Sequence, residues 1–151
     1  MNLLNKKIKN LNIKLASKSP RRQELLSNII EDFEIVTKDI EENYPKKLKA
    51  DEIALYLANL KANSYLQKSK ENELYITADT IVVYDNKVLG KPNNFQDAFR
   101  MLKELSGNTH NVYTGVSLLL NGKINSFLDS TKVSFYDLSD EEITFYINNY
   151  K

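Results

Sequence analysis

Short β-rich apolar runs alternate with segments of helical periodicity through the first half of the chain. The predicted elements are strands at residues 13–16, 33–36 and 74–84 and helices at residues 20–30 and 50–67. Strands separated by helices join one sheet, and the helices cover its faces. Later strands then pair locally. The order predicts an α/β fold.

Local signals add further elements. Ser19 is expected to cap the first helix, which starts at Pro20 and buries a stripe containing Leu25, Leu26, Ile29 and Ile30. Asn121-Gly122 is typical of the tight turn of a β-hairpin between residues 111–120 and 124–136. The remaining predictions are a strand at residues 87–89, a helix at about residues 95–105 capped by Asn93 or Asn94, and a last helix from the capping box at Ser139 to Lys151.

Length and charge limit the kinds of partner. With 151 residues, the chain has the size of one domain with one core, and its 42% hydrophobic and 27% charged residues are ordinary for a folded protein. The 21 basic and 20 acidic residues give a net charge of +1, too small for an overall field that would hold nucleic acid or an anionic membrane. Any anion site must be local.

The sequence lacks cysteine, a secretory signal and a membrane span, and these absences bear on the cellular compartment. The sequence has no cysteine, which excludes disulfides and thiolate metal sites and fits a reducing environment. The first twelve residues lack the apolar run of a secretory signal, and no stretch approaches the roughly 20 apolar residues of a membrane span. We therefore expect a cytoplasmic protein without a membrane partner.

A first candidate site is the segment Ser17-Lys18-Ser19-Pro20-Arg21-Arg22, which lies where a predicted strand meets a helix. Unpaired amides and the positive end of the helix dipole favour an anion there, and arginine can donate two hydrogen bonds to a phosphate. The alternative is an ordinary capped helix with two solvated arginines.

A second candidate is Asp79, which interrupts an apolar, β-rich run together with Thr80. A carboxylate in such a place is costly unless it is paired or binds a metal. It could orient a water molecule, accept its proton or hold Mg²⁺. The alternative is an aspartate at a strand end that faces water.

Other polar residues carry weaker signals. Lys91 follows a tight Gly-Lys-Pro turn and is suited to a phosphate oxygen, although a lysine in a turn is usually only solvated. Glu42 and Lys61 are unremarkable alone. His110, the single histidine, is expected to have a role in a turn or a pocket wall and not in catalysis.

Six segments in chain order resemble the Maf family of nucleotide pyrophosphatases: LASKSPRRQELL, DIEEN, LANLKA, ITADTIVV, LGKP and LKELSGNTHNVYTGV. The resemblance spans residues 13 to about 147. It implies an α/β fold like that of inosine triphosphatases, with an elongated mixed sheet flanked by helices and a central cleft. It also implies hydrolysis of nucleoside triphosphates to monophosphate and pyrophosphate with a divalent metal, Mg²⁺ or Mn²⁺.

The resemblance assigns roles residue by residue. Asp79 and Glu42 are the expected catalytic and metal-binding acids. The expected substrate-binding residues are Ser19, Arg21, Arg22, Lys61 and Lys91. A triphosphate brings about four negative charges, which these cations and a metal can balance.

The resemblance also leads to expectations about the substrate and the extent of the domain. The segment from Ser106 to Gly115 resembles the branch of the family that acts on dTTP and UTP, and the alternatives are the 7-methyl-GTP branch, a regulatory module that binds nucleotide without turnover, and a domain without a ligand. Residues 1–151 are expected to form a single Maf-like domain, and assembly as a homodimer is left open. Family members continue beyond the last helix, so the resemblance predicts a domain truncated at its C-terminus.

Overall fold

The computed structural model describes residues 3–150, which form five helices and six strands. The first part of the chain contains α1 (Leu3–Ile8), β1 (Asn12–Ala16), α2 (Pro20–Ser27), β2 (Glu34–Val36) and α3 (Ala50–Asn63). The rest contains β3 (Glu73–Tyr84), β4 (Lys87–Leu89), α4 (Phe95–Leu105), β5 (Thr109–Leu120), β6 (Lys123–Ser134) and α5 (Asp140–Asn149). The predicted α/β class is confirmed.

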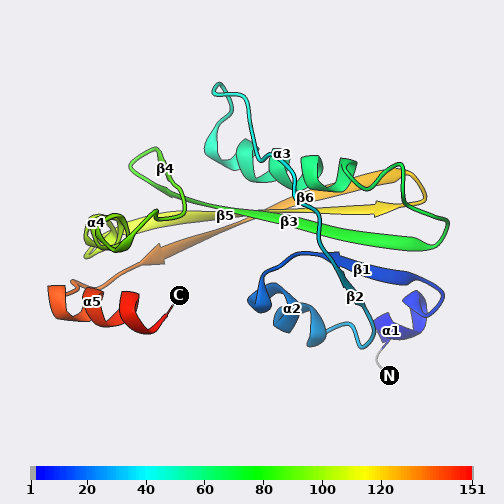
Figure 1. Cartoon of the computed structure of the whole chain (residues 1–151), viewed down its shortest axis with the longest axis horizontal. Helices are drawn as coiled ribbons and strands as arrows, with labels where there is room; N and C mark the ends of the chain where they lie inside the picture. Colours follow the sequence, from blue (N-terminus) through cyan, green and yellow to red (C-terminus); the bar gives the residue numbers. More distant parts are fainter. Residues whose placement is uncertain (1–2, 151) are drawn as a thin grey trace.

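One mixed sheet runs through the molecule in the order β2-β1-β3-β5-β6, and β4 pairs with β3. β1 is parallel to both β2 and β3, whereas β5 is antiparallel to both of its neighbours, β3 and β6. The three long strands extend along the molecule, with α1 and α2 near one end and α4 and α5 near the other (Figure 1). The predicted elongated mixed sheet flanked by helices is confirmed.

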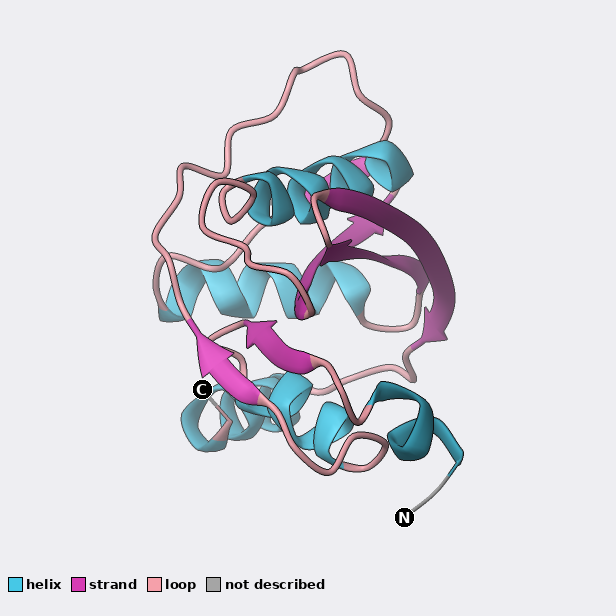
Figure 2. Cartoon of the chain, turned by 90° about the vertical axis from the view of Figure 1, so that its right-hand side faces the viewer, coloured by secondary structure: helices cyan, strands magenta, loops and turns pink. Residues whose placement is uncertain are grey.

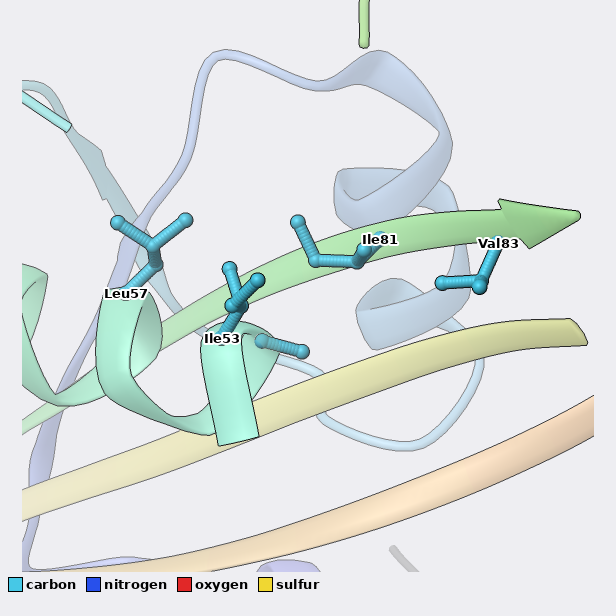
Figure 3. Packing of buried hydrophobic residues seen from close by; sticks show 5 residues of the cluster. Ile53, Leu57, Ile81 and Val83 are labelled. Atoms are coloured by element: carbon cyan, nitrogen blue, oxygen red, sulfur yellow. The ribbon is translucent and has the colours of Figure 1, made fainter. Parts of the chain in front are cut away.

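The core lies between this sheet and α3, which runs along one face of the long strands (Figures 1 and 2). Ile53 and Leu57 of α3 pack against Ile81 and Val83 of β3, and all four are buried (Figure 3). The predicted helical spacing therefore gives α3 its buried face. A second cluster continues the core toward the other end of α3 and consists of Ala62, Tyr65, Tyr75 and Leu119.

Gly115 of β5 allows α3 to approach the sheet closely. A Cβ atom at this position would lie 2.5 Å from the backbone oxygen of Ala54 and 2.7 Å from the amide nitrogen of Leu55. No side chain fits at these separations without moving α3. Gly115 pairs with Asp79 of β3, so the closest approach of α3 lies beside the candidate acidic residue.

The capping signals in the sequence are confirmed. The side chains of Ser19, Asn94 and Ser139 each accept a hydrogen bond from the backbone of the helix that they precede. Asn121 and Gly122 have positive φ angles of 49° and 75° and join β5 to β6 as predicted. The last helix ends at Asn149, and Lys151 lies outside the described residues.

Two helix ends differ from the prediction. α2 stops at Ser27, where the backbone amide of Asn28 bonds the oxygen of Leu26, so the expected stripe is not buried as a unit. Leu25 and Ile29 are 61% and 53% exposed, and only Ile30 is fully buried. α3 stops at Asn63 instead of residue 67, because the Ser64 hydroxyl bonds the oxygen of Lys61 and the chain continues in turns.

Helix α1 was not predicted. Its sequence, LLNKKI, has too few apolar positions for a recognisable helical period. Contacts of Asn5 with the oxygen of Ile29 and the side chain of Glu31 hold α1 against the segment after α2. Within residues 3–150, no helix has the length and apolar character needed to cross a membrane.

Candidate active site

A cleft opens where one edge of β3 is left free. β1 pairs with β3 only as far as Ile76, and β4 begins to pair at Val82. Among the described residues, no strand pairs with residues 77–81 along this edge. Crevices beyond the carboxyl ends of parallel strands are common ligand sites, and the cleft here has a volume of about 940 Å³.

Six of the seven candidate residues line this cleft. Ser19 and Arg22 come from the start of α2, Glu42 from the loop after β2 and Lys61 from α3. Asp79 belongs to β3, and Lys91 follows β4. Distant segments of the chain therefore converge, as the proposed polyphosphate site requires.

Arg21 is the exception. Its side chain is exposed and, in the part of the chain that the structure describes, it is not among the residues that line the cleft. Neighbouring residues on a helix point about 100° apart, so only one of the two arginines can face the cleft directly. The substrate-binding role expected for Arg21 stays a prediction.

Lys61 joins the two candidate acids. Its Nζ lies 2.6 Å from Oδ1 of Asp79 and 3.2 Å from Oε1 of Glu42. The side chains of Lys61 and Asp79 are only 18% and 11% exposed, whereas that of Glu42 is 49% exposed. Asp79 is thus a buried carboxylate with a charged partner, and the alternative of an aspartate that simply faces water is wrong.

Arg22 contacts the residues on both sides of Asp79. Its Nη1 donates to the oxygen of Ala78 at 2.8 Å and its Nη2 to Oγ1 of Thr80 at 3.0 Å. Thr80 in turn shares a hydrogen bond with Thr114 of β5 at 3.1 Å. A guanidinium group has five N–H donors, so these two contacts leave others available for an anion in the cleft.

Ser19 has a structural task as well as a place in the cleft wall. Its Oγ accepts from the backbone nitrogen of Arg22 at 3.4 Å, and its own nitrogen donates to Oγ of Ser17 at 3.1 Å. Gln23 donates to the oxygen of Ser17. These bonds fix the turn between β1 and α2 and direct Arg22 toward β3.

Residues 37–49 join β2 to α3 and carry further residues of the cleft wall (Figure 1). We call this segment the acidic loop after Asp39, Glu41 and Glu42 near its centre. Asp39 pairs with Lys18 at 2.7 Å, and this hydrogen bond holds the pKa of the Asp39 carboxyl below its usual range. Lys38 donates to the oxygen of Ser64 at 2.7 Å and lies over the ring of Tyr65. The sequence had indicated no role for Lys38 or Asp39, because no local pattern shows where such a loop folds back.

The two acids fit a divalent cation. Both carboxylates contact the same ammonium nitrogen, so their oxygens already converge on one positive charge. Mg²⁺ is commonly held by one or two carboxylates together with substrate phosphates and water. Residues 3–150 contain no cluster of three or more acidic, histidine or cysteine side chains arranged for a metal, so phosphate oxygens and water would complete the shell.

His110 lies away from the cleft, in β5. It is buried, its ring packs edge-on against Phe135 at 5.0 Å, and burial lowers its pKa below the usual 6.5. Its Nδ1 has no hydrogen-bond partner among the described residues. The prediction of a non-catalytic position agrees with this location, although the residue is in a strand and not in a turn.

The fold resembles that of a solved structure. A nucleoside-triphosphatase described as a dITP/XTP pyrophosphatase, from Mycobacterium abscessus, superimposes with a TM-score of 0.53 at 17% identity over 82% of this chain and 74% of that one. At this identity the likeness shows the fold alone. The fold and the site define an α/β protein whose mixed sheet carries a cleft with cations gathered around a buried carboxylate.

Sequence comparison narrows this class to one family. The family model described as Maf-like protein matches residues 12–151, and the chain belongs to this family. A Flavobacterium johnsoniae protein named dTTP/UTP pyrophosphatase is 52% identical, over 99% of this chain and 77% of its own length. A Phocaeicola vulgatus protein of the same name is 54% identical, over 91% of this chain and 72% of its own length.

Proposed function

We propose that this protein hydrolyses nucleoside triphosphates, with dTTP and UTP as the first candidates, to the monophosphate and pyrophosphate. The observation that carries the proposal is the convergence of Arg22, Lys61 and Lys91 with the buried Asp79 in one cleft. The names of the two relatives support the choice of dTTP and UTP. Their high identity over nearly the whole chain favours this substrate pair over 7-methyl-GTP.

The cations of the cleft suit the negative charge of a triphosphate. Arg22, Lys61 and Lys91 each bring one positive charge, and the amides at the start of α2 add the positive end of a helix dipole. Hydrolysis moves negative charge onto the leaving pyrophosphate, and cations fixed before the reaction stabilise that change most effectively.

In the reaction that we propose, Asp79 accepts a proton from a water molecule whose oxygen attacks the α-phosphorus. The bond between that phosphorus and the oxygen bridging to the β-phosphate breaks, and the electron pair leaves with pyrophosphate. Lys61 holds Asp79 in place, and Arg22 fixes the backbone at Ala78 on the same free edge of β3. A positioned base of this kind contributes roughly 10²–10⁴-fold.

Asp79 and Glu42 would hold the divalent metal, Mg²⁺ or Mn²⁺. When bound, such an ion supplies charge neutralisation and polarises phosphoryl oxygens. The convergence of both carboxylates on one ammonium group supports this assignment.

A product assay tests the proposal. The purified chain is incubated with dTTP, UTP, CTP, dATP and 7-methyl-GTP in Mg²⁺ or Mn²⁺, and the products are separated by anion-exchange chromatography. We expect monophosphate and pyrophosphate, fastest from dTTP and UTP. Binding without turnover would favour a regulatory module, and diphosphate with inorganic phosphate would exclude the proposed reaction.

The proposal also covers the domain organisation, the cellular location and the oligomeric state. Residues from both ends of the described chain pack on one continuous sheet, which supports a single domain. The cysteine-free sequence supports a cytoplasmic location. Phe127 is 54% exposed on the outer strand β6, which supports a homodimer, and light scattering after gel filtration would measure its mass.

A further inference from the structure

Each acidic side chain of the acidic loop that lines the cleft is paired with a cation that also lines the cleft. Asp39 pairs with Lys18 of the β1–α2 turn, and Glu42 pairs with Lys61 of α3. Glu41, which lies between them in sequence, does not line the cleft, and its carboxylate accepts from Asn43. The loop thus directs its carboxylates selectively at the cations on two walls of the cleft.

We propose that the acidic loop is an internal competitor for polyphosphate, and that Lys18 is a phosphate-binding residue that Asp39 covers until substrate arrives. This inference rests on the proposed function. In it, the carboxylate of Asp39 holds a position on Lys18 that a phosphate group of the substrate later takes.

The weakness of the ion pair between Lys18 and Asp39 favours displacement of Asp39 by polyphosphate. The side chains of Lys18 and Asp39 are 67% and 92% exposed, and ion pairs this exposed contribute little because water and salt screen them. A polyphosphate brings several charges and contacts several cations at once, so it can displace a single carboxylate. Lys18 is also next to the amides at the start of α2, where an anion is already favoured.

The other attachment of the loop would remain after displacement. Lys38 donates to the backbone oxygen of Ser64 and lies over the ring of Tyr65, and neither contact depends on the pairing of Asp39 with Lys18. The loop is therefore held at residue 38 while Asp39 can leave Lys18. With no regular helix or strand between Val36 and Ala50, the loop has the length and character common in segments that move over active sites.

The test measures binding of inorganic tripolyphosphate by calorimetry, which avoids any effect of the base. Lys18→Met is expected to weaken binding by about three- to tenfold, because one charged contact is lost. Asp39→Asn is expected to tighten binding by about two- to fivefold, because the competing carboxylate is gone. Both side chains are exposed, so circular dichroism and thermal melting should show an unchanged fold.

Two controls separate competition from a general change of charge. Glu41→Gln makes the same charge change on the same loop without freeing a cation, and it should alter the affinity less than Asp39→Asn does. In the double variant Lys18→Met/Asp39→Asn, the gain from the Asp39 change should disappear, because its competitor has no cation to free.

The inference is overturned if Lys18→Met binds tripolyphosphate as well as the wild type does. It is also overturned if Asp39→Asn behaves like Glu41→Gln, or if its gain persists in the double variant. These outcomes leave the proposed function intact, since the wild type would still bind tripolyphosphate and hydrolyse dTTP. Failure of the wild type in both assays would instead reject the proposed function.

Discussion

Asp79 is held in a position that few aspartates occupy, buried on a strand with a lysine ammonium 2.6 Å away. Asp79→Asn keeps the shape of the side chain but removes its charge and its ability to accept a proton. We expect turnover of dTTP to fall by about 10²–10⁴-fold while nucleotide binding persists. Steady-state kinetics together with calorimetric binding would measure both, and full turnover by this variant would remove Asp79 from the mechanism.

Arg22 and Arg21 form a matched pair on α2, because only Arg22 reaches the cleft and the backbone beside Asp79. Arg22→Gln should lower kcat/KM by about tenfold or more, since it removes both a phosphate contact and the support at Ala78. Arg21→Gln should lower it far less. The prediction fails if the two variants lose the same activity.

His110 makes stability depend on pH. Burial lowers its pKa in the folded protein, whereas in the unfolded chain it keeps its usual value of 6.5. Above pH 6.5 both states are neutral and the contribution is fully present. As the pH falls through the lower folded value, the unfolded chain has taken up a proton that the folded one resists, so stability is lost.

His110→Leu removes the titrating group and retains an apolar contact for Phe135. Melting temperatures between about pH 7.5 and pH 5 should fall more steeply for the wild type than for His110→Leu. Parallel curves for the two proteins would show that another group causes the acid sensitivity.

At the level of secondary structure, the fit between α3 and β5 depends on Gly115. Adding a methyl group there places an atom 2.5 Å from a backbone oxygen of α3, so the helix must shift. Gly115→Ala should reduce the free energy of unfolding by about 1–3 kcal/mol. Gly90→Ala is the control because nothing lies within 4 Å of its Cβ, and it should change stability by less than about 0.5 kcal/mol.

Urea denaturation of the two glycine variants would give both values. Equal stability would mean that α3 accommodates the methyl group without cost. If Gly115→Ala also lowers the turnover of dTTP under conditions where the variant is still folded, the placement of α3 also sets the contact between Lys61 and Asp79.

Elements with a strong local signal could be predicted from the sequence. Ser19 before Pro20, Asn121-Gly122 and the capping box at Ser139 each depend on neighbours within a few residues, and all three are present. The end of α2 and the short helix α1 could not be predicted, because contacts with distant residues such as those of Asn5 help to fix them.

For the whole molecule, the fold class and most of the candidate site were predictable, but the cleft itself was not. Alternating strands and helices indicated the α/β class, and six of the seven candidate residues line the cleft. The cleft exists because, among the described residues, β1 and β4 leave residues 77–81 of β3 without a strand partner on one edge. That gap depends on long-range strand register, and no local pattern in the sequence shows it.

The central step of the proposed reaction is attack by water at the α-phosphorus of a nucleotide held in this cleft. Hydrolysis of dTTP in ¹⁸O-labelled water, followed by mass spectrometry of the products, tests this step most directly. We expect one labelled oxygen in the thymidine monophosphate and none in the pyrophosphate. Label in the pyrophosphate, or diphosphate with inorganic phosphate as products, would contradict it.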